Sequence, residues 1–474
     1  MSIRTLALAA TILGLTGCAS AAPDTPPAIV QVSPAADIAA LVSKAQQAAP
    51  YPAIAVSVRK GDEVIYEGAV GIADLEQDTS ATPETVFAIG SITKSFTSIA
   101  ISQQVAAGKV DLDAPVGTYL KDYAGPAKDA PVWTLMNHTS GLINFNSQPD
   151  FPSGSRREFT RREMRDMFET HDLMFPSGSA FSYSNSGTYL LGLIVEAVSG
   201  QTYDQYLTEN VLSPLGLEHT YYNLPSRVIP HRAEGYTVTE DGYGNAPLLD
   251  PLVPFSAGSL ASTVEDIQHY LDAVHRKNLL GDGIRDTLYT QKPFPDGETN
   301  PYALGALVIR TWEGHRKIAH AGDIDGFSAY MAYYPDEDVS IVVLANTREV
   351  SPTPVGIEQK IARILFDTPR PSNAAGPLTE SQITALVGNY DIGSMRIGLD
   401  RVGIVAQDGG IAVRFGGTAA PTDAIPLVLI SDMTFYAAHD DEMVFSFGAG
   451  AKDGAADLTV DYTGGVFAFS KTEE

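Results

Sequence analysis

The segment Gly90-Ser91-Ile92-Thr93-Lys94-Ser95-Phe96 decides how this chain is interpreted. It opens a run to Ala107 in which apolar residues recur at roughly helical spacing. Three residues apart on a helix, the Ser91 hydroxyl and the Lys94 amine share one face, about 5–6 Å apart at Cβ. A serine is a weak nucleophile until a base takes its proton, and a lysine whose pKa is lowered can be that base. The spacing therefore favours a covalent serine hydrolase.

The same spacing also occurs at Ser57 and Lys60, inside a stretch that alternates and is rich in β-branched residues. On a strand, residues three apart point to opposite faces, so these two side chains cannot cooperate. We interpret them as the end of a strand.

The N-terminus predicts export and lipid anchoring. Residues 1–17 combine Arg4 with an apolar stretch too short to span a membrane, as in a secretory signal. They end Leu15-Thr16-Gly17-Cys18, which resembles a bacterial lipobox with Cys18 as the lipidated residue. Residues 18–36 are rich in Ala and Pro and read as an extended tether. We expect a membrane-attached protein of the bacterial cell envelope, on the periplasmic face of the outer membrane, because Ala19 follows the cysteine.

Composition excludes several functions. The formal net charge is −26, with 57 acidic and 31 basic residues, which argues against nucleic-acid partners and polybasic docking on anionic lipid. Cys18 is the only cysteine, so no intrachain disulfide can form. We predict neither a cofactor nor a bound metal.

Strand patterns lie at both ends of residues 37–367, and helical, loop-rich sequence lies between them. The expected fold is α/β (α+β), with one antiparallel sheet built from the two ends, flanking helices and a helical subdomain. Residues 368–378 read as a linker, and 379–474 as an all-β, barrel-like domain with recurrent turn signals.

Two further motifs complete a site. The second is Tyr183-Ser184-Asn185, between a Pro/Gly turn and an apolar helix, and the third is His320-Ala321-Gly322. Their order and spacing, with the segments 135–142 and 258–263, resemble the serine β-lactamase and penicillin-binding-protein superfamily over about residues 38–366. The resemblance is to the branch with class C β-lactamases, D-alanyl-D-alanine carboxypeptidases, D-aminopeptidases and esterases.

The resemblance implies a role for each residue. Ser91 attacks a carbonyl carbon, and Lys94 or Tyr183 is the general base, a choice that the sequence leaves open. Asn185 contacts the substrate amide and orients Lys94. Gly322 belongs to the substrate-binding motif, and the oxyanion is held by the backbone N–H groups of Ser91 and Asp323. His138 is interpreted as shaping a loop.

The third motif bears on specificity. With a reference pKa near 6.5, His320 is mostly neutral at pH 7, which weakens the case for a β-lactamase. Arg310 stands where some carboxypeptidases of this branch carry an arginine that binds the substrate carboxylate, although an exposed strand arginine explains it equally well. Activity on carboxylate substrates is expected to rise toward about pH 6 unless Arg310 supplies the charge.

We therefore predict a serine hydrolase that forms an acyl-serine, with amide bonds of D-amino-acid-containing peptides as the leading substrate (DD-carboxypeptidase or D-aminopeptidase type). An esterase of short acyl esters, a weak class C-like β-lactamase and a non-catalytic envelope binding protein remain alternatives. The C-terminal domain resembles lipocalin-like barrels appended to some peptidases of this branch. Its role and the oligomeric state stay open.

Overall fold

The computed structural model describes residues 33–148, 151, 157–297, 299–348, 350–369, 377–393, 395–396, 400–431, 433–438, 440–448, 458–462 and 465–472. Cys18, its signal, residues 18–32 of the tether and most of the linker predicted at 368–378 lie outside these residues. The last part of the predicted tether, residues 34–36, is not extended but forms the first turn of helix α1 (Pro34–Ala48). Pro34–Glu474 forms one compact unit. The predicted domain boundaries stay predictions.

One antiparallel sheet of eight strands organises the unit, in the order β10-β11-β12-β13-β14-β1-β2-β3. The two ends of the hydrolase region meet where β1 pairs with β14, with Val56 opposite Val343. Both strands are buried almost throughout, which explains their apolar, β-branched sequences. This confirms the predicted sheet. Its strands are β1 (Ala53–Lys60), β2 (Glu63–Asp74), β3 (Thr79–Ser80), β10 (Tyr302–Ala303), β11 (Leu307–Trp312), β12 (His315–Ile324), β13 (Phe327–Tyr334) and β14 (Val339–Ala345).

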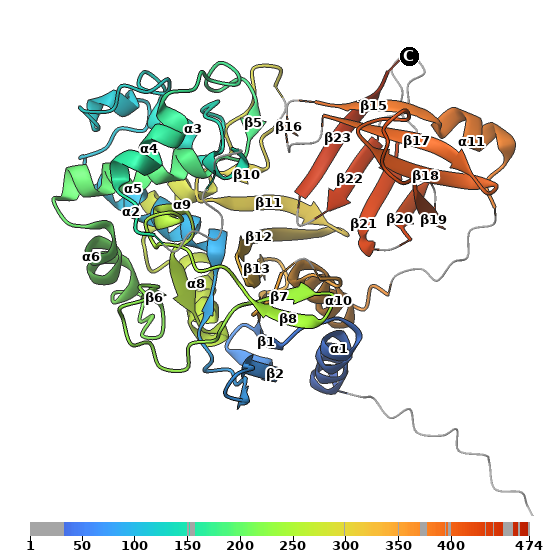
Figure 1. Ribbon diagram of the computed structural model, residues 1–474, viewed down its shortest axis with the longest axis horizontal. Helices are drawn as coiled ribbons and strands as arrows, with labels where there is room; N and C mark the ends of the chain where they lie inside the picture. The colour runs from blue at the N-terminus through green and yellow to red at the C-terminus, as the bar shows by residue number, and fades with distance from the viewer. Residues whose placement is uncertain are drawn as a thin grey trace, which may run out of the picture. The chain divides into compact units, whose positions relative to one another are not determined.

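Helices cover both faces of this sheet (Figure 1). On one face α1 (Pro34–Ala48) and α10 (Pro354–Phe366) pack into a core with β1, β13 and β14. On the other face a larger core contains α2 (Thr93–Ala106), α5 (Asn185–Ser199) and α8 (Val264–Leu271). The helical subdomain is completed by α3 (Val132–Met136), α4 (Arg161–Glu169), α6 (Tyr203–Leu207), α7 (Phe255–Gly258) and α9 (Asp282–Tyr289).

The C-terminal strands close into a barrel with its own apolar core, as the sequence predicted. A short helix, α11 (Glu380–Leu386), precedes it and begins with a Thr379–Gln382 capping box. The barrel strands are β15 (Gly388–Ile392), β17 (Arg401–Gln407), β18 (Gly410–Phe415), β19 (Ile425–Ser431), β20 (Thr434–Ala437), β21 (Asp440–Phe447), β22 (Leu458–Tyr462) and β23 (Gly465–Lys471).

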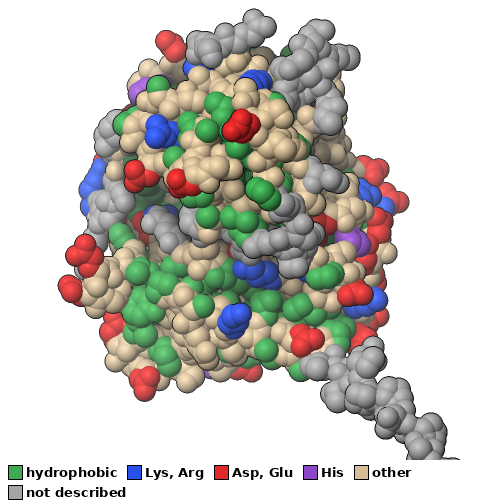
Figure 2. Space-filling model, turned by 90° about the vertical axis from the view of Figure 1, so that its right-hand side faces the viewer, with side chains coloured by type: hydrophobic (Ala, Val, Ile, Leu, Met, Phe, Trp, Pro, Cys, Tyr) green, Lys and Arg blue, Asp and Glu red, His purple; other side chains and the backbone are tan. Residues whose placement is uncertain are grey.

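No helix within the described residues is both long and apolar enough to cross a membrane. Over the same residues, no cluster of three or more His, Cys, Asp or Glu side chains could hold a metal ion. On the face drawn in Figure 2, acidic side chains are scattered rather than gathered into one patch.

Candidate active site

Ser91 and Lys94 lie where a short 3-10 turn runs into helix α2. The turn, η1, spans Gly90–Ile92, and α2 continues from Thr93. Lys94 Nζ lies 2.9 Å from Ser91 Oγ. The i, i+3 spacing thus places the amine in direct contact with the hydroxyl, the geometry that a base needs to take the serine proton.

Two glycines let the Ser91 turn lie against strand β12. Gly90 has φ +47°, and a Cβ there would lie 2.8 Å from the backbone oxygen of Asp323. A Cβ on Gly322 would lie 2.0 Å from the backbone oxygen of Ile89. This mutual close approach brings the backbones of Ser91 and Asp323 together, as expected for the two N–H donors of an oxyanion hole.

Lys94 is buried. Its side chain is 1% exposed, and Nζ donates a 2.8 Å hydrogen bond to the carbonyl of Ala257 in α7. Burial lowers the pKa of Lys94 well below its usual value, because the charged amine would lose its hydration. A neutral amine can donate to Ala257 while its lone pair receives the Ser91 proton.

Tyr183 contacts the same hydroxyl. It follows β5 (Phe181–Ser182), and its phenol hydrogen-bonds Ser91. The ring lies 4.9 Å from Lys94 Nζ and 4.2 Å from the His138 ring. Burial raises the pKa of Tyr183, so its phenol stays protonated and can donate to a departing group.

His320 is held as a neutral imidazole. Nδ1 donates to the carbonyl of Ala321, and Nε2 lies 2.7 Å from the Tyr302 hydroxyl, which therefore donates to it. Burial, and then the nearby Lys94, lower the pKa of His320 to about 3. The expected rise in carboxylate-substrate activity toward pH 6 therefore has no basis in His320, since the ring does not become charged there.

Arg310 lies outside the site. In the sheet it is paired with Lys317, three residues before His320 on β12, so the two side chains project from the face opposite His320. Arg310 Nη1 contacts Asp461 Oδ2 of barrel strand β22 at 2.7 Å. The structure therefore does not bring Arg310 to Ser91, and the carboxylate-binding role that the resemblance suggested for it has no geometric support.

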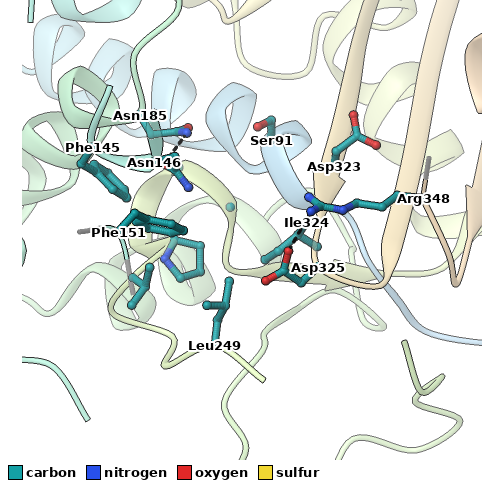
Figure 3. Close-up of a pocket in the computed structure, with 14 residues that line it drawn as sticks. Ser91, Phe145, Asn146, Phe151, Asn185, Leu249, Asp323, Ile324, Asp325 and Arg348 are labelled. Atoms are coloured by element: carbon teal, nitrogen blue, oxygen red, sulfur yellow. Dashed lines mark hydrogen bonds and ion pairs between the residues drawn. The ribbon is translucent and has the colours of Figure 1, made fainter. Parts of the chain in front are cut away.

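A hollow of about 330 Å³ opens beside Ser91 (Figure 3). Asn185, at the start of α5, points into it and donates through Nδ2 to Asn146 Oδ1 at 2.8 Å. On another wall Arg348 pairs with Asp325 at 3.1 Å. The other residues that line it are Phe145, Phe151, Leu249, Val253, Pro254, Ala257, Gly258, Asp323 and Ile324.

The structure thus brings together Ser91, Lys94, Tyr183, Asn185, His320, Gly322 and the backbone of Asp323. Sequence reasoning missed Asn146 and Tyr302. Asn146 lies in a short 3-10 turn, and Tyr302 in a two-residue strand, so neither belongs to a periodic pattern. The only available signal was their aromatic or amide chemistry, which is common in loops.

Comparison with known proteins identifies the family. The family model described as Beta-lactamase matches residues 38–364. Penicillin-binding protein 4* of Bacillus subtilis is 24% identical over 71% of this chain and 77% of its own length. Protein flp of Staphylococcus aureus is 27% identical over 62% of this chain, and the match spans 59% of its length.

Two solved structures share the fold. An octameric penicillin-binding protein homologue from Pyrococcus abyssi aligns over 92% of this chain and 98% of its own, with a TM-score of 0.60 and 24% identity. The D-amino acid amidase from Ochrobactrum anthropi aligns over 70% of this chain and 97% of its own, with a TM-score of 0.61 and 23% identity. The chain belongs to the Beta-lactamase family, within the β-lactamase and penicillin-binding-protein superfamily.

Proposed function

We propose that this protein cleaves amide bonds of peptides containing D-amino acids through an acyl-serine intermediate. The observation that carries the proposal is the buried Lys94 amine, whose Nζ lies 2.9 Å from Ser91 Oγ. The Tyr183 phenol is hydrogen-bonded to the same serine hydroxyl. Solved relatives that bear the name D-amino acid amidase, and a relative named as a penicillin-binding protein, support this substrate class.

The chemistry follows from these contacts. Lys94 takes the Ser91 proton as Oγ bonds to the carbonyl carbon, and the N–H groups of Ser91 and Asp323 hold the oxyanion. The C–N bond breaks as Tyr183 gives a proton to the leaving nitrogen. Water, deprotonated by the tyrosinate, then attacks the acyl-serine, and the released Ser91 is reprotonated from Lys94.

Purified protein tests the proposal against matched D- and L-alanine peptides, with Ser91→Ala as the control. We expect turnover of the D-peptides, at least tenfold slower turnover of the L-peptides and none with Ser91→Ala. Equal turnover of both enantiomers, or D-peptide turnover that survives Ser91→Ala, contradicts the proposal.

An esterase is the second candidate. The neutral His320 and the position of Arg310 on the other face of the sheet favour it, because an ester substrate needs neither charge. A panel of short acyl esters in the same assay decides: turnover of esters alone, with no D-peptide hydrolysed, supports the esterase.

We also propose that Cys18 is lipidated and tethers the enzyme to the cell envelope, at the periplasmic face of the outer membrane. The lipobox-like Leu15-Thr16-Gly17-Cys18 supports this. Cys18→Ala should release the protein from the membrane fraction and abolish labelling by an alkyne fatty acid. Wild-type protein that carries a free Cys18 thiol contradicts it.

A further inference from the structure

His138 is bonded to the backbone on both sides of Tyr183, although the reaction proposed above gives it no role. It lies two residues after the end of helix α3. Its backbone carbonyl accepts a 2.9 Å hydrogen bond from the N–H of Ser182, and its Nδ1 accepts one of 3.2 Å from the N–H of Ser184. The centroid of its ring lies 4.2 Å from that of Tyr183. One residue therefore holds the chain before and after the phenol and also packs on the phenol ring.

The contact with Ser184 fixes the protonation of the imidazole. Because a backbone N–H can only donate, Nδ1 of His138 is unprotonated and Nε2 carries the proton. His138 is 1% exposed, and its Nε2 makes no hydrogen bond within the part of the chain that the structure describes. Burial, and then the nearby Lys94 and His320, lower the pKa of His138 well below its usual value. The ring thus stays neutral at pH 7, and Nδ1 stays an acceptor.

The backbone of His138 is unusual as well. Its φ is +59°, in a left-handed region that few residues other than glycine adopt and in which Asn, Asp and His are enriched. Directly after it, the carbonyl of Thr139 accepts a 2.7 Å hydrogen bond from the N–H of Gly178, in the segment that leads to Tyr183. Shaping a loop accounts for this backbone conformation, but it does not account for the bond between the ring and Ser184.

Other contacts hold the second half of the Tyr183-Ser184-Asn185 motif. Ser184 Oγ donates to the carbonyl of Ile143 at 3.0 Å, and the N–H of Asn185 donates to Asn144 Oδ1 at 3.1 Å. These bonds fix the start of helix α5, whereas His138 contacts the Tyr183 ring itself. Loss of its acceptor would leave the buried N–H of Ser184 unpaired, one residue after the phenol.

We propose that His138 is a positioning residue for Tyr183, which it holds where the phenol can protonate the leaving nitrogen and its anion can then deprotonate water. His138 itself takes no proton in the reaction. The inference rests on the proposed amide hydrolysis and deepens it. Removing the acceptor should therefore slow the steps that need Tyr183 more than the attack by Ser91, which Lys94 activates.

Two variants of nearly equal shape test this role. His138→Asn and His138→Leu both lose the ring, but asparagine keeps an acceptor oxygen at the position of Nδ1. On the D-alanine peptide of the assay above, kcat of His138→Leu should be at least tenfold below that of His138→Asn, with KM within about threefold. His171→Leu is the control, because His171 is exposed and follows helix α4. It should keep the kcat of the wild type.

Labelling of Ser91 by a fluorophosphonate separates positioning from a general structural role. Fluoride is a weak base that leaves without a proton from Tyr183, so the labelling rates of the two variants should differ less than about threefold. Equal kcat in both variants overturns the inference. A labelling rate that falls as far as kcat also overturns it, because His138 then shapes the whole site.

The wild type offers a test that does not depend on the folding of His138→Leu. In 15N NMR of histidine-labelled protein, the His138 signals are those that His138→Asn removes. They should show the proton on Nε2 at pH 7. A proton on Nδ1 overturns the inference, because that nitrogen could not accept from Ser184.

Failure of the proposed function gives a different result. Wild-type protein that is labelled on Ser91 but hydrolyses no D-peptide contradicts the proposed substrate class. The two variants are then compared on the short acyl ester that is hydrolysed, because hydrolysis of its acyl-enzyme needs Tyr183 as well. Equal kcat on that ester overturns the inference about His138.

Discussion

At the scale of single residues, Lys94 decides whether Ser91 can react. Its amine is buried and lies 2.9 Å from the hydroxyl, and burial lowers its pKa. Lys94→Met should reduce kcat/KM by roughly 10²- to 10⁴-fold, the usual contribution of a general base. The matched control is Lys60→Met, because Lys60 stands three residues after Ser57 on an exposed strand end and should leave kcat/KM unchanged.

The same variant should not lose stability. Burial lowers the pKa of Lys94 in the folded state. At pH values below the ordinary lysine pKa of 10.5, the amine is therefore protonated more fully in the unfolded chain than in the folded protein. This difference disfavours folding. Methionine removes that cost and keeps most of the side-chain volume. Thermal unfolding at pH 7 should give a melting temperature equal to the wild type or higher. A fall of several degrees would show that the lost hydrogen bonds to Ala257 and Ser91 outweigh the cost of burying the amine.

His320 makes a prediction about pH. Since burial lowers its pKa to about 3, the ring stays neutral from pH 5 to pH 8. For an uncharged amide substrate, kcat/KM plotted against pH should therefore have no inflection near pH 6.5 that comes from His320. The profiles of the wild type and of His320→Gln should have the same shape in this range. An inflection near 6.5 that is lost in His320→Gln would show that the ring titrates in solution as an exposed histidine does.

At the scale of elements, the contact between the η1 turn and strand β12 forms the site. A Cβ at Gly322 would lie 2.0 Å from the backbone oxygen of Ile89, so the strand would have to move away from Ser91. Gly322→Ala should cost about 1–3 kcal/mol of unfolding free energy and reduce kcat at least a hundredfold through the displaced oxyanion donor. Gly283→Ala in α9, with nothing within 4 Å of its Cβ, should be neutral or slightly stabilising. Equal results for both variants, by urea titration and kinetics, would contradict this packing.

Elements with strong periodicity could be predicted from the sequence, and those fixed by distant contacts could not. The strand at Phe327–Tyr334 is buried almost throughout, which its continuous apolar sequence indicates. The helix at Glu380–Leu386 begins with a Thr379–Gln382 capping box, which is a local signal in the sequence. Strand β12 begins His315-Arg316-Lys317, a basic run that reads as a loop, and it became a strand by pairing with β11 and β13. Lys317 is tolerated inside because Glu358 of α10 contacts it at 2.5 Å.

At the scale of the whole molecule, the barrel supplies a carboxylate that forms an ion pair with an arginine of the eight-stranded sheet. The Arg310 side chain is 8% exposed, and Asp461, 151 positions along the chain, contacts it. No local pattern could show this pairing. The family resemblance suggested a substrate role for Arg310, the alternative was an exposed strand arginine, and the buried pair with Asp461 is neither of these.

Asp461→Ala should lower stability by about 3 kcal/mol, because it leaves the Arg310 charge buried without its carboxylate. The ratio of the KM for carboxylate substrates to the KM for neutral substrates should be the same in Asp461→Ala as in the wild type. Asp391→Ala is the control, since Asp391 of the barrel domain is 41% exposed in its ion pair with Arg401. Its loss should cost less than about 1 kcal/mol. Urea midpoints that fall equally in the two variants would show that the Arg310–Asp461 contact is not a buried pair.

The central claim is that Ser91, activated by Lys94, forms an acyl-enzyme, and intact-protein mass spectrometry tests it most directly. Protein quenched in acid during turnover of an N-acyl-D-alanine amide should gain the mass of the acyl group. Peptide mapping should place it on Ser91, and Ser91→Ala should gain nothing. An acyl group found on another residue, or an unmodified Ser91 throughout rapid turnover, would contradict the account.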